Sequence, residues 1–215
     1  MAETRLIGRK RWKQGDILIM IKHWPTIKDL ESARQAYEKN EPRDLFYRIA
    51  IELTTLAIDN RTSITLSEAI ASLLQTWNRS YYQYRKFDGQ HFHDIEELIE
   101  KTLPLVRELR DNRIGCSNAE IRNLYTDYEK VLGPVGAAKC LHLLVPDFFP
   151  LWDRAIAEKY GLPLRKTGDN AKLYIEFLEH TREQRDRIEE KQIHGRHLLK
   201  AIDEYNYCKF TKGWI

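Results

Sequence analysis

The sequence lacks any hydrophobic run long enough to cross a bilayer. Its longest apolar runs, such as the ILIMI stretch at residues 17–21, fall far short of the about 20 residues that a membrane-spanning helix needs. The first residues, MAETRLIGRKRWK, also lack the apolar core and small-residue cleavage site of a secretory signal. We therefore expect a cytoplasmic protein without a membrane partner.

Cysteine is scarce, and metal-binding motifs are missing. The three cysteines are Cys116, Cys140 and Cys208. They are scattered, lack CxxC spacing and cannot supply the four thiolates of an iron–sulfur cluster or a four-cysteine zinc site. The histidine pairs in HFH (His91, His93) and HGRH (His194, His197) have no companion ligand at established spacing. With no P-loop, dinucleotide fingerprint or serine nucleophile elbow either, we predict no metal and no cofactor.

Neither positive nor negative residues are in large excess, since the formal net charge is only +3. This balance permits a nucleic-acid partner without demanding one. A short basic arm surrounds Trp12 and comprises Arg5, Arg9, Lys10, Arg11 and Lys13. It is suited to phosphates or another anionic surface, and a solvated terminal tail is the alternative.

The sequence has few glycines and prolines and almost no alternating strand pattern, whereas amphipathic helical patterns follow one another along the chain. Capping-box spacings at Thr26, Thr65 and Ser117 mark three helix starts, and aspartate caps are expected at Asp88 and Asp153. Pro42 opens a further helix, and the last two are expected over residues 169–190 and 196–208. We predict an all-α protein of a single helical unit over residues 1–215.

Three details of this pattern are specific enough to be tested. The helix after Pro42 repeats apolar residues at three and four positions, which predicts an inward face of Leu45, Phe46, Ile49, Leu53 and Leu56. Pro104 is expected to kink or divide the helix that begins at Asp88. The helix from Ser117 is expected to stop at Gly133-Pro134.

Gly133-Pro134-Val135-Gly136 is a turn too short to be a flexible linker. Its glycines allow positive φ or close approach to another group, and the amides that start the second helix favour an anion such as a phosphate. Such a contact would hold DNA without reading its sequence. An ordinary corner between two helices, with glycines that only permit close packing, is the alternative interpretation.

The segment LGPVGAAKCLHLL followed by FFPLWDRAI resembles the signature of the helix-hairpin-helix DNA glycosylase superfamily over residues 132–161. In that family a Gly-hydrophobic-Gly hairpin precedes a proline-containing loop and an aspartate at a helix start. The resemblance implies two interleaved helical lobes, with residues 117–161 as the hairpin and catalytic segment. It also implies DNA-backbone contacts from Gly133, Val135, Gly136 and Lys139, and a catalytic role for Asp153.

Lys139 bears on the type of glycosylase. Bifunctional members of the family place a Schiff-base lysine two residues after the second hairpin glycine, where this sequence has Ala138. Lys139 is one position further, or about 100° around a helix, so we expect a monofunctional enzyme and a phosphate or solvent contact for Lys139. A shifted turn would restore Lys139 as the catalytic nucleophile.

Asp153 is the candidate catalytic carboxylate. Cleavage of an N-glycosidic bond develops positive charge on the sugar, which a buried carboxylate stabilises while helping to align water. The same residue is well suited to cap the following helix, and the two roles are compatible.

An extracted base needs aromatic or apolar walls, and the TWNRSYYQYRKF stretch is dense in aromatic residues. The candidates for the base pocket are Trp77, Tyr81, Tyr82, Tyr84 and Trp152. Each of them is also suited to seal the gap between helices or to lie in the core.

The sequence therefore predicts a monomeric, nucleoid-associated DNA glycosylase that acts on double-stranded DNA with a damaged or modified base. A noncatalytic helix-hairpin-helix DNA-binding adaptor and an all-α protein-interaction domain are the competing hypotheses. The identity of the base depends on pocket shape, and both DNA repair and defence against foreign modified DNA stay open.

Overall fold

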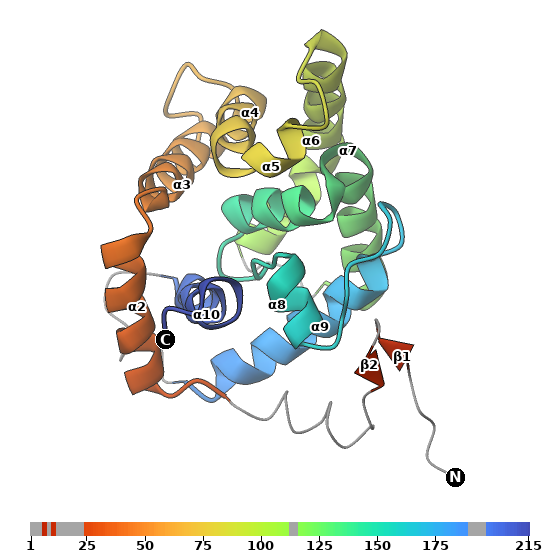
Figure 1. The fold of residues 1–215 in the computed structure, drawn as a ribbon. Coiled ribbons are helices and arrows are strands. Elements are labelled where there is room, and N and C mark those ends of the chain that lie inside the picture. Colours follow the sequence, from red (N-terminus) through yellow and green to blue (C-terminus); the bar gives the residue numbers. More distant parts are fainter. Residues whose placement is uncertain (1–5, 8–9, 12–23, 112–115, 189–196) are drawn as a thin grey trace.

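The computed structural model describes residues 6–7, 10–11, 24–111, 116–188 and 197–215, and nearly all of this part is helical (Figure 1). The α-helices are α2 (Ile27–Asn40), α3 (Asp44–Ile58), α4 (Leu66–Trp77), α5 (Arg79–Tyr82), α6 (Gly89–Arg110), α7 (Asn118–Leu144), α8 (Arg154–Lys159), α9 (Ala171–Asp186) and α10 (Leu198–Asn206). A π-helix, η2 (Tyr207–Lys212), continues α10. Two two-residue strands, β1 (Leu6–Ile7) and β2 (Lys10–Arg11), pair antiparallel. The all-α prediction is confirmed, and within the described part no helix is both long and apolar enough to cross a membrane.

The helix starts follow local capping chemistry. The side chains of Thr26, Thr65 and Ser117 each accept a hydrogen bond from the backbone N–H three residues ahead, and each is part of a complete capping box. Asp88 and Asp153 cap α6 and α8 in the same way with a carboxylate oxygen. These predicted starts are confirmed because a cap depends only on residues within one turn.

One sequence prediction about the helices is wrong, and of the two effects expected at Pro104 the division of the helix is absent. On α3, Leu45 and Ile49 are about half exposed, at 48% and 53%. The buried face of α3 comprises Tyr47, Ala50, Thr54, Ala57 and Ile58. Pro104 does not divide α6, which runs unbroken as one 22-residue helix. Buried residues on both sides of Pro104, such as Ile99 and Val106, hold the two halves of α6 against the same core and offset the lost backbone hydrogen bond.

The largest hydrophobic cluster surrounds α7 and takes in side chains from α4, α6, α8 and α9. A second cluster lies between α2 and the C-terminal α10–η2 segment, so segments some 170 residues apart lie side by side (Figure 1). A third, small cluster of Tyr47, Ala50, Leu73 and Leu143 joins α3, α4 and α7. The region where these clusters meet is the one that contains the candidate site.

Helix α7 is two helices joined without a linker. Gly133 has φ 71° and ψ 170°, which breaks the helical path where the sequence predicts the stop. Only glycine adopts this conformation without marked strain. Pro134 then begins the second half, as proline commonly does at the first position of a helix. The predicted stop of the helix at Gly133-Pro134 is therefore confirmed, and residues 134–136 belong to the second helical half.

Part of the sequence analysis falls outside the described residues. This holds for the ILIMI stretch, for His194, and for Arg5, Arg9, Trp12 and Lys13 of the basic arm. The remaining two residues of the arm, Lys10 and Arg11, form strand β2.

Candidate functional site

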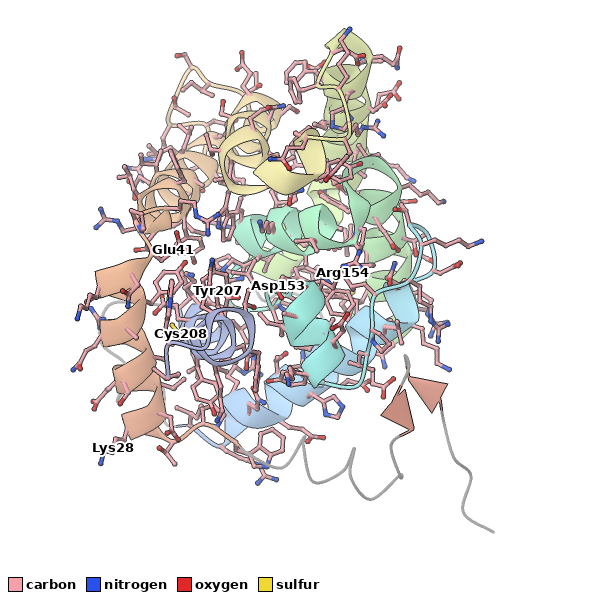
Figure 2. All side chains as sticks on the ribbon, viewed as in Figure 1. Lys28, Glu41, Asp153, Arg154, Tyr207 and Cys208 are labelled. Atoms are coloured by element: carbon pink, nitrogen blue, oxygen red, sulfur yellow. The ribbon has the colours of Figure 1, made fainter. Side chains whose placement is uncertain are left out.

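A cavity of about 620 Å³ lies where the α7 turn, the end of α4, the start of α8 and the α2–α10–η2 side of the molecule meet. Figure 2 shows Asp153 and Arg154 at the end of α8 nearest α7, with Glu41 and Tyr207 on the side of α2 and η2. The walls therefore come from segments distributed over most of the chain. A volume of this size is typical of small-molecule pockets, which usually range from about 300 to 1,000 Å³.

Most of the residues selected from the sequence line this one cavity. The lining includes Trp77, Tyr81, Gly133, Val135, Gly136, Lys139, Trp152 and Asp153. Tyr82 and Tyr84 do not line it. The Tyr82 hydroxyl is hydrogen-bonded to His91 Nε2 at 2.9 Å, and Tyr84 is 92% exposed. The turn, the aspartate and three of the five aromatic candidates thus share one hollow.

The two glycines of the turn have a packing role. A Cβ at Gly133 would lie 2.8 Å from Cε2 of Tyr81, and a Cβ at Gly136 would lie 2.9 Å from Nδ2 of Asn78. The Tyr81 hydroxyl donates to the Val131 carbonyl at 3.2 Å, which fixes this contact. Close packing therefore favours glycine at both positions, and both glycines also line the cavity.

The second half of α7 presents its first turn to the cavity. Gly133 has no side chain to cap this turn, and Val135 and Gly136 both line the hollow. Asn78, which also lines it, has a buried Nδ2 without a hydrogen-bond partner among the described residues. The Nδ2 atom is enclosed against Gly136 and does not reach the cavity, so only the amides at the helix start favour an anionic ligand here.

Lys139 lies on the wall between the turn and α4. Its Nζ donates to the Trp77 carbonyl at 2.6 Å and lies 4.8 Å from the centroid of the Trp77 ring. Burial lowers the pKa of Lys139 to about 8, although the carboxylates of Asp203 and Asp153 oppose this shift. The partner in the structure is thus a backbone carbonyl, and the amine still borders the cavity.

Asp153 has a hydrogen-bond donor at each carboxylate oxygen. Oδ1 accepts from the Ile156 backbone N–H at 2.8 Å, which makes Asp153 the N-cap of α8. Oδ2 accepts from the Thr211 hydroxyl at 2.8 Å, across from η2. The capping interpretation is confirmed, and the second bond fixes the plane of a carboxylate that borders the cavity.

Trp152 is largely a core residue. Its side chain is buried, with rings of Phe177 and Tyr174 within 5.5 Å and 5.1 Å. Its Nε1 donates to the Pro134 carbonyl at 3.2 Å. Trp152 therefore ties the aspartate loop to the α7 turn while exposing one edge to the cavity.

Sequence reasoning missed a charged cluster on the α2 side of the cavity. Nε and NH2 of Arg43 donate to the two carboxylate oxygens of Glu41 at 2.7 and 2.6 Å, and the Tyr207 hydroxyl donates to Glu41 at 2.7 Å. Burial would raise the pKa of Glu41, but the hydrogen bonds from Arg43 and Tyr207 outweigh it and lower the pKa to about 2. No local motif marks these residues, because Tyr207 is 166 positions from Glu41.

Asp203 on α10 was missed as well. It lines the cavity with a side chain that is only 12% exposed, and its Oδ2 accepts from the buried Lys200 Nζ at 3.1 Å. Burial and the nearby Asp153 raise the pKa of Asp203, whereas Lys200 and Lys139 lower it, and the net shift is upward. The cavity therefore contains a second carboxylate besides Asp153.

The other candidates for metal or acid–base chemistry are structural. His142 is buried; its Nδ1–H donates to the Phe149 carbonyl at 2.8 Å and its Nε2 accepts from the Tyr47 hydroxyl at 3.0 Å. Burial lowers the pKa of His142 to about 3, so this ring is neutral. In the ranges that the structure describes, no group of three or more His, Cys, Asp or Glu side chains is placed to hold a metal ion.

Comparisons of the chain with protein-family models, curated proteins and solved structures returned no match. The resemblance to helix-hairpin-helix glycosylases therefore depends on the residues between Leu132 and Gly161 and on their arrangement around the cavity.

Proposed function

We propose that this protein is a monofunctional DNA glycosylase that hydrolyses the N-glycosidic bond of a damaged or modified base in double-stranded DNA. The observation that supports the proposal most directly is that Asp153 and the Gly133–Gly136 turn line the same cavity. A glycosylase needs this juxtaposition because the strand must be held next to the sugar that reacts.

The charges and rings of the cavity suit the proposed substrate. The carboxylates of Glu41, Asp153, Glu158 and Asp203 line it together with three cations, and because Arg43 is paired with Glu41, the cations that favour a phosphate-bearing strand are Lys139 and Arg154. Trp77 and Tyr81 provide aromatic surface, on which a flipped base can stack. The protein walls thus combine what a polyanionic strand and a planar base require.

Asp153 would act on the sugar. As the bond from C1′ to the base breaks, positive charge develops on the sugar ring, and the Asp153 carboxylate stabilises it. A water molecule then adds to C1′ and passes its proton to the carboxylate. The hydrogen bonds from the Ile156 N–H and the Thr211 hydroxyl hold the carboxylate in a fixed orientation. The carboxylate therefore does not have to reorient during the reaction.

A noncatalytic DNA-binding module is the second candidate. One observation favours it: both oxygens of Asp153 already have protein donors, as expected of a residue that only caps α8 and fastens η2. In that case the turn would hold DNA, and the cavity would have no chemical role.

The test is the excision of bases from duplexes that carry a panel of altered bases, scored as alkali-labile abasic sites. The Asp153→Asn variant keeps a side chain that can cap α8, and we expect it to lose activity by about 100-fold or more. Asp88→Asn is the matched control, because Asp88 caps α6 with nearly the same backbone angles and does not line the cavity.

Retention of activity in Asp153→Asn would reject the role of this carboxylate. If the wild type excises nothing, yet binds duplex DNA with an affinity that falls as salt increases, the binding-module candidate is correct.

A further inference from the structure

We infer that Asp203 is a second catalytic carboxylate, which protonates the departing base, and that the substrate class is accordingly neutral purine bases. The inference rests on the proposed glycosylase function. It adds the chemistry of the leaving group, which Asp153 next to the sugar does not supply.

Geometry places Asp203 where such an acid is needed. Asp203 lines the same cavity as Asp153, Trp77 and Lys139. It comes from α10, which is far from the α7 turn in the sequence. Its side chain is largely buried, so a proton on it is shielded from bulk water. The cavity therefore holds two carboxylates from different elements, which is the arrangement that acid-assisted glycoside cleavage requires.

The hydrogen bonds of Asp203 leave one oxygen available. Oδ2 accepts from Lys200, and Oδ1 has no hydrogen-bond partner among the residues that the structure describes. The residue itself lines the cavity. Asp153, by contrast, has a protein donor on each oxygen.

The electrostatic surroundings keep a proton on Asp203 at a higher pH than usual for an aspartate. Burial raises its pKa, and the charge of Asp153 adds to this. The titratable groups around it come from several elements: Tyr37 on α2, Tyr47 on α3, Lys139 on α7, Asp153 before α8, Lys200 on α10 and Cys208 on η2. Two carboxyl groups whose environments differ in this way can divide the roles of acid and carboxylate.

The proposed step balances as follows. The bond between C1′ and N9 of the purine breaks, and its electron pair goes to the purine. Asp203 transfers its proton to a ring nitrogen, so that the base leaves as a neutral molecule. Water adds to C1′ and gives its proton to Asp153, which releases it to solvent, and Asp203 regains a proton from solvent. A neutral purine needs this assistance, whereas a base that already carries a positive charge leaves without it.

The experiment compares single-turnover excision of hypoxanthine, a neutral purine, with that of 7-methylguanine, a cationic one, from otherwise identical duplexes. For Asp203→Asn we expect about a 100-fold slower release of hypoxanthine and a change of less than about threefold for 7-methylguanine. Retained activity on the cationic base also shows that the variant is folded. Glu204→Gln is the matched control, since Glu204 lies 3.7 Å from the same Lys200 and does not line the cavity.

Each of the other outcomes contradicts a stated part of the inference. Equal losses on both bases in Asp203→Asn, or the same selective loss in Glu204→Gln, overturn the assignment of Asp203 and leave the glycosylase proposal standing. Excision of 7-methylguanine but not hypoxanthine by the wild type overturns the substrate class. If the wild type excises neither, the inference fails, and the wider panel of altered bases decides separately whether the protein is a glycosylase.

Discussion

Asp88 and Asp153 are both aspartates that cap a helix in nearly the same backbone conformation, but the two regions around them differ. Their backbone angles are φ −128°, ψ −179° and φ −129°, ψ −177°, and each accepts a hydrogen bond from the backbone N–H three residues ahead. Asp88 caps α6 and makes no other hydrogen bond among the described residues. Asp153 also accepts from Thr211 and borders the cavity.

The comparison teaches that capping chemistry accounts for the conformation of an aspartate but not for its surroundings. The same contrast separates Gly133, which packs against Tyr81 at the cavity, from Gly213, which has a similar φ of 64° and open space around it. Function has to be inferred from what surrounds a helix end as well as from the end itself.

The largest expected effect on stability is that of Gly133→Ala. The substitution forces a side chain into a backbone region suited to glycine and places its Cβ 2.8 Å from the Tyr81 ring. We expect the free energy of unfolding to fall by about 3–5 kcal/mol, the sum of backbone strain and overpacking. Urea denaturation measures the change.

Gly213→Ala gives a lower limit for the backbone strain, because an added Cβ there meets nothing within 4 Å and its conformation (φ 64°, ψ 38°) is less strained for alanine than that of Gly133 (φ 71°, ψ 170°). It should cost only about 1–2 kcal/mol. Similar losses at the two positions would show that the contact with Tyr81 contributes nothing.

The next effect concerns the two aspartate caps. Asp88→Ala removes a helix cap and should lower the free energy of unfolding by about 1 kcal/mol, whereas Asp153→Ala removes a cap and the bond from Thr211 and should lower it by about 2 kcal/mol. Only Asp153→Ala should also abolish base excision. If Asp153→Ala instead raises the free energy of unfolding, the carboxylate at the cavity lowers the stability of the fold. Asp153 would then differ from Asp88 in its effect on stability as well as in its surroundings.

The smallest effect is expected at Thr211. Thr211→Val removes the donor to Asp153 Oδ2 while keeping the shape of the side chain, and should lower stability by about 1 kcal/mol. Thr211→Ser keeps the hydroxyl and is the control. We expect Thr211→Val to lower the rate of excision with little change in DNA affinity, and an unchanged rate would show that Asp153 needs no second donor.

The parts of the fold that the sequence predicted are those set by neighbouring residues. The capping boxes at Thr26, Thr65 and Ser117 and the break at Gly133 each depend on a few consecutive residues, and all four are correct. The face of α3 was predicted wrongly, because its apolar residues surround more of the helix than one stripe and only packing selects Tyr47 over Leu45.

The candidate site was predictable on one side only. The turn and Asp153 lie within one segment whose motif can be read directly. Glu41, Asp203 and Thr211 come from α2, α10 and η2, and they meet that segment only because the terminal helices pack together. No spacing in the sequence encodes such a meeting, so these residues could be found only in three dimensions.

The wide turn of η2 has a consequence for how this protein tolerates length changes. A π-helix holds one residue more per turn than the α-helix that it interrupts, and such widened turns often occur at functional sites. Deleting a single residue between Tyr207 and Phe210 would let α10 continue as an ordinary helix, and position 211 would keep nearly the same direction, because the loss of one residue compensates for the wider turn. The hydroxyl of Thr211 would then stay near Asp153, whereas the same deletion within the α-helical turns of α10 would rotate position 211 by about 100° and break this bond, so η2 is the part of the C-terminal segment that tolerates the loss of a residue.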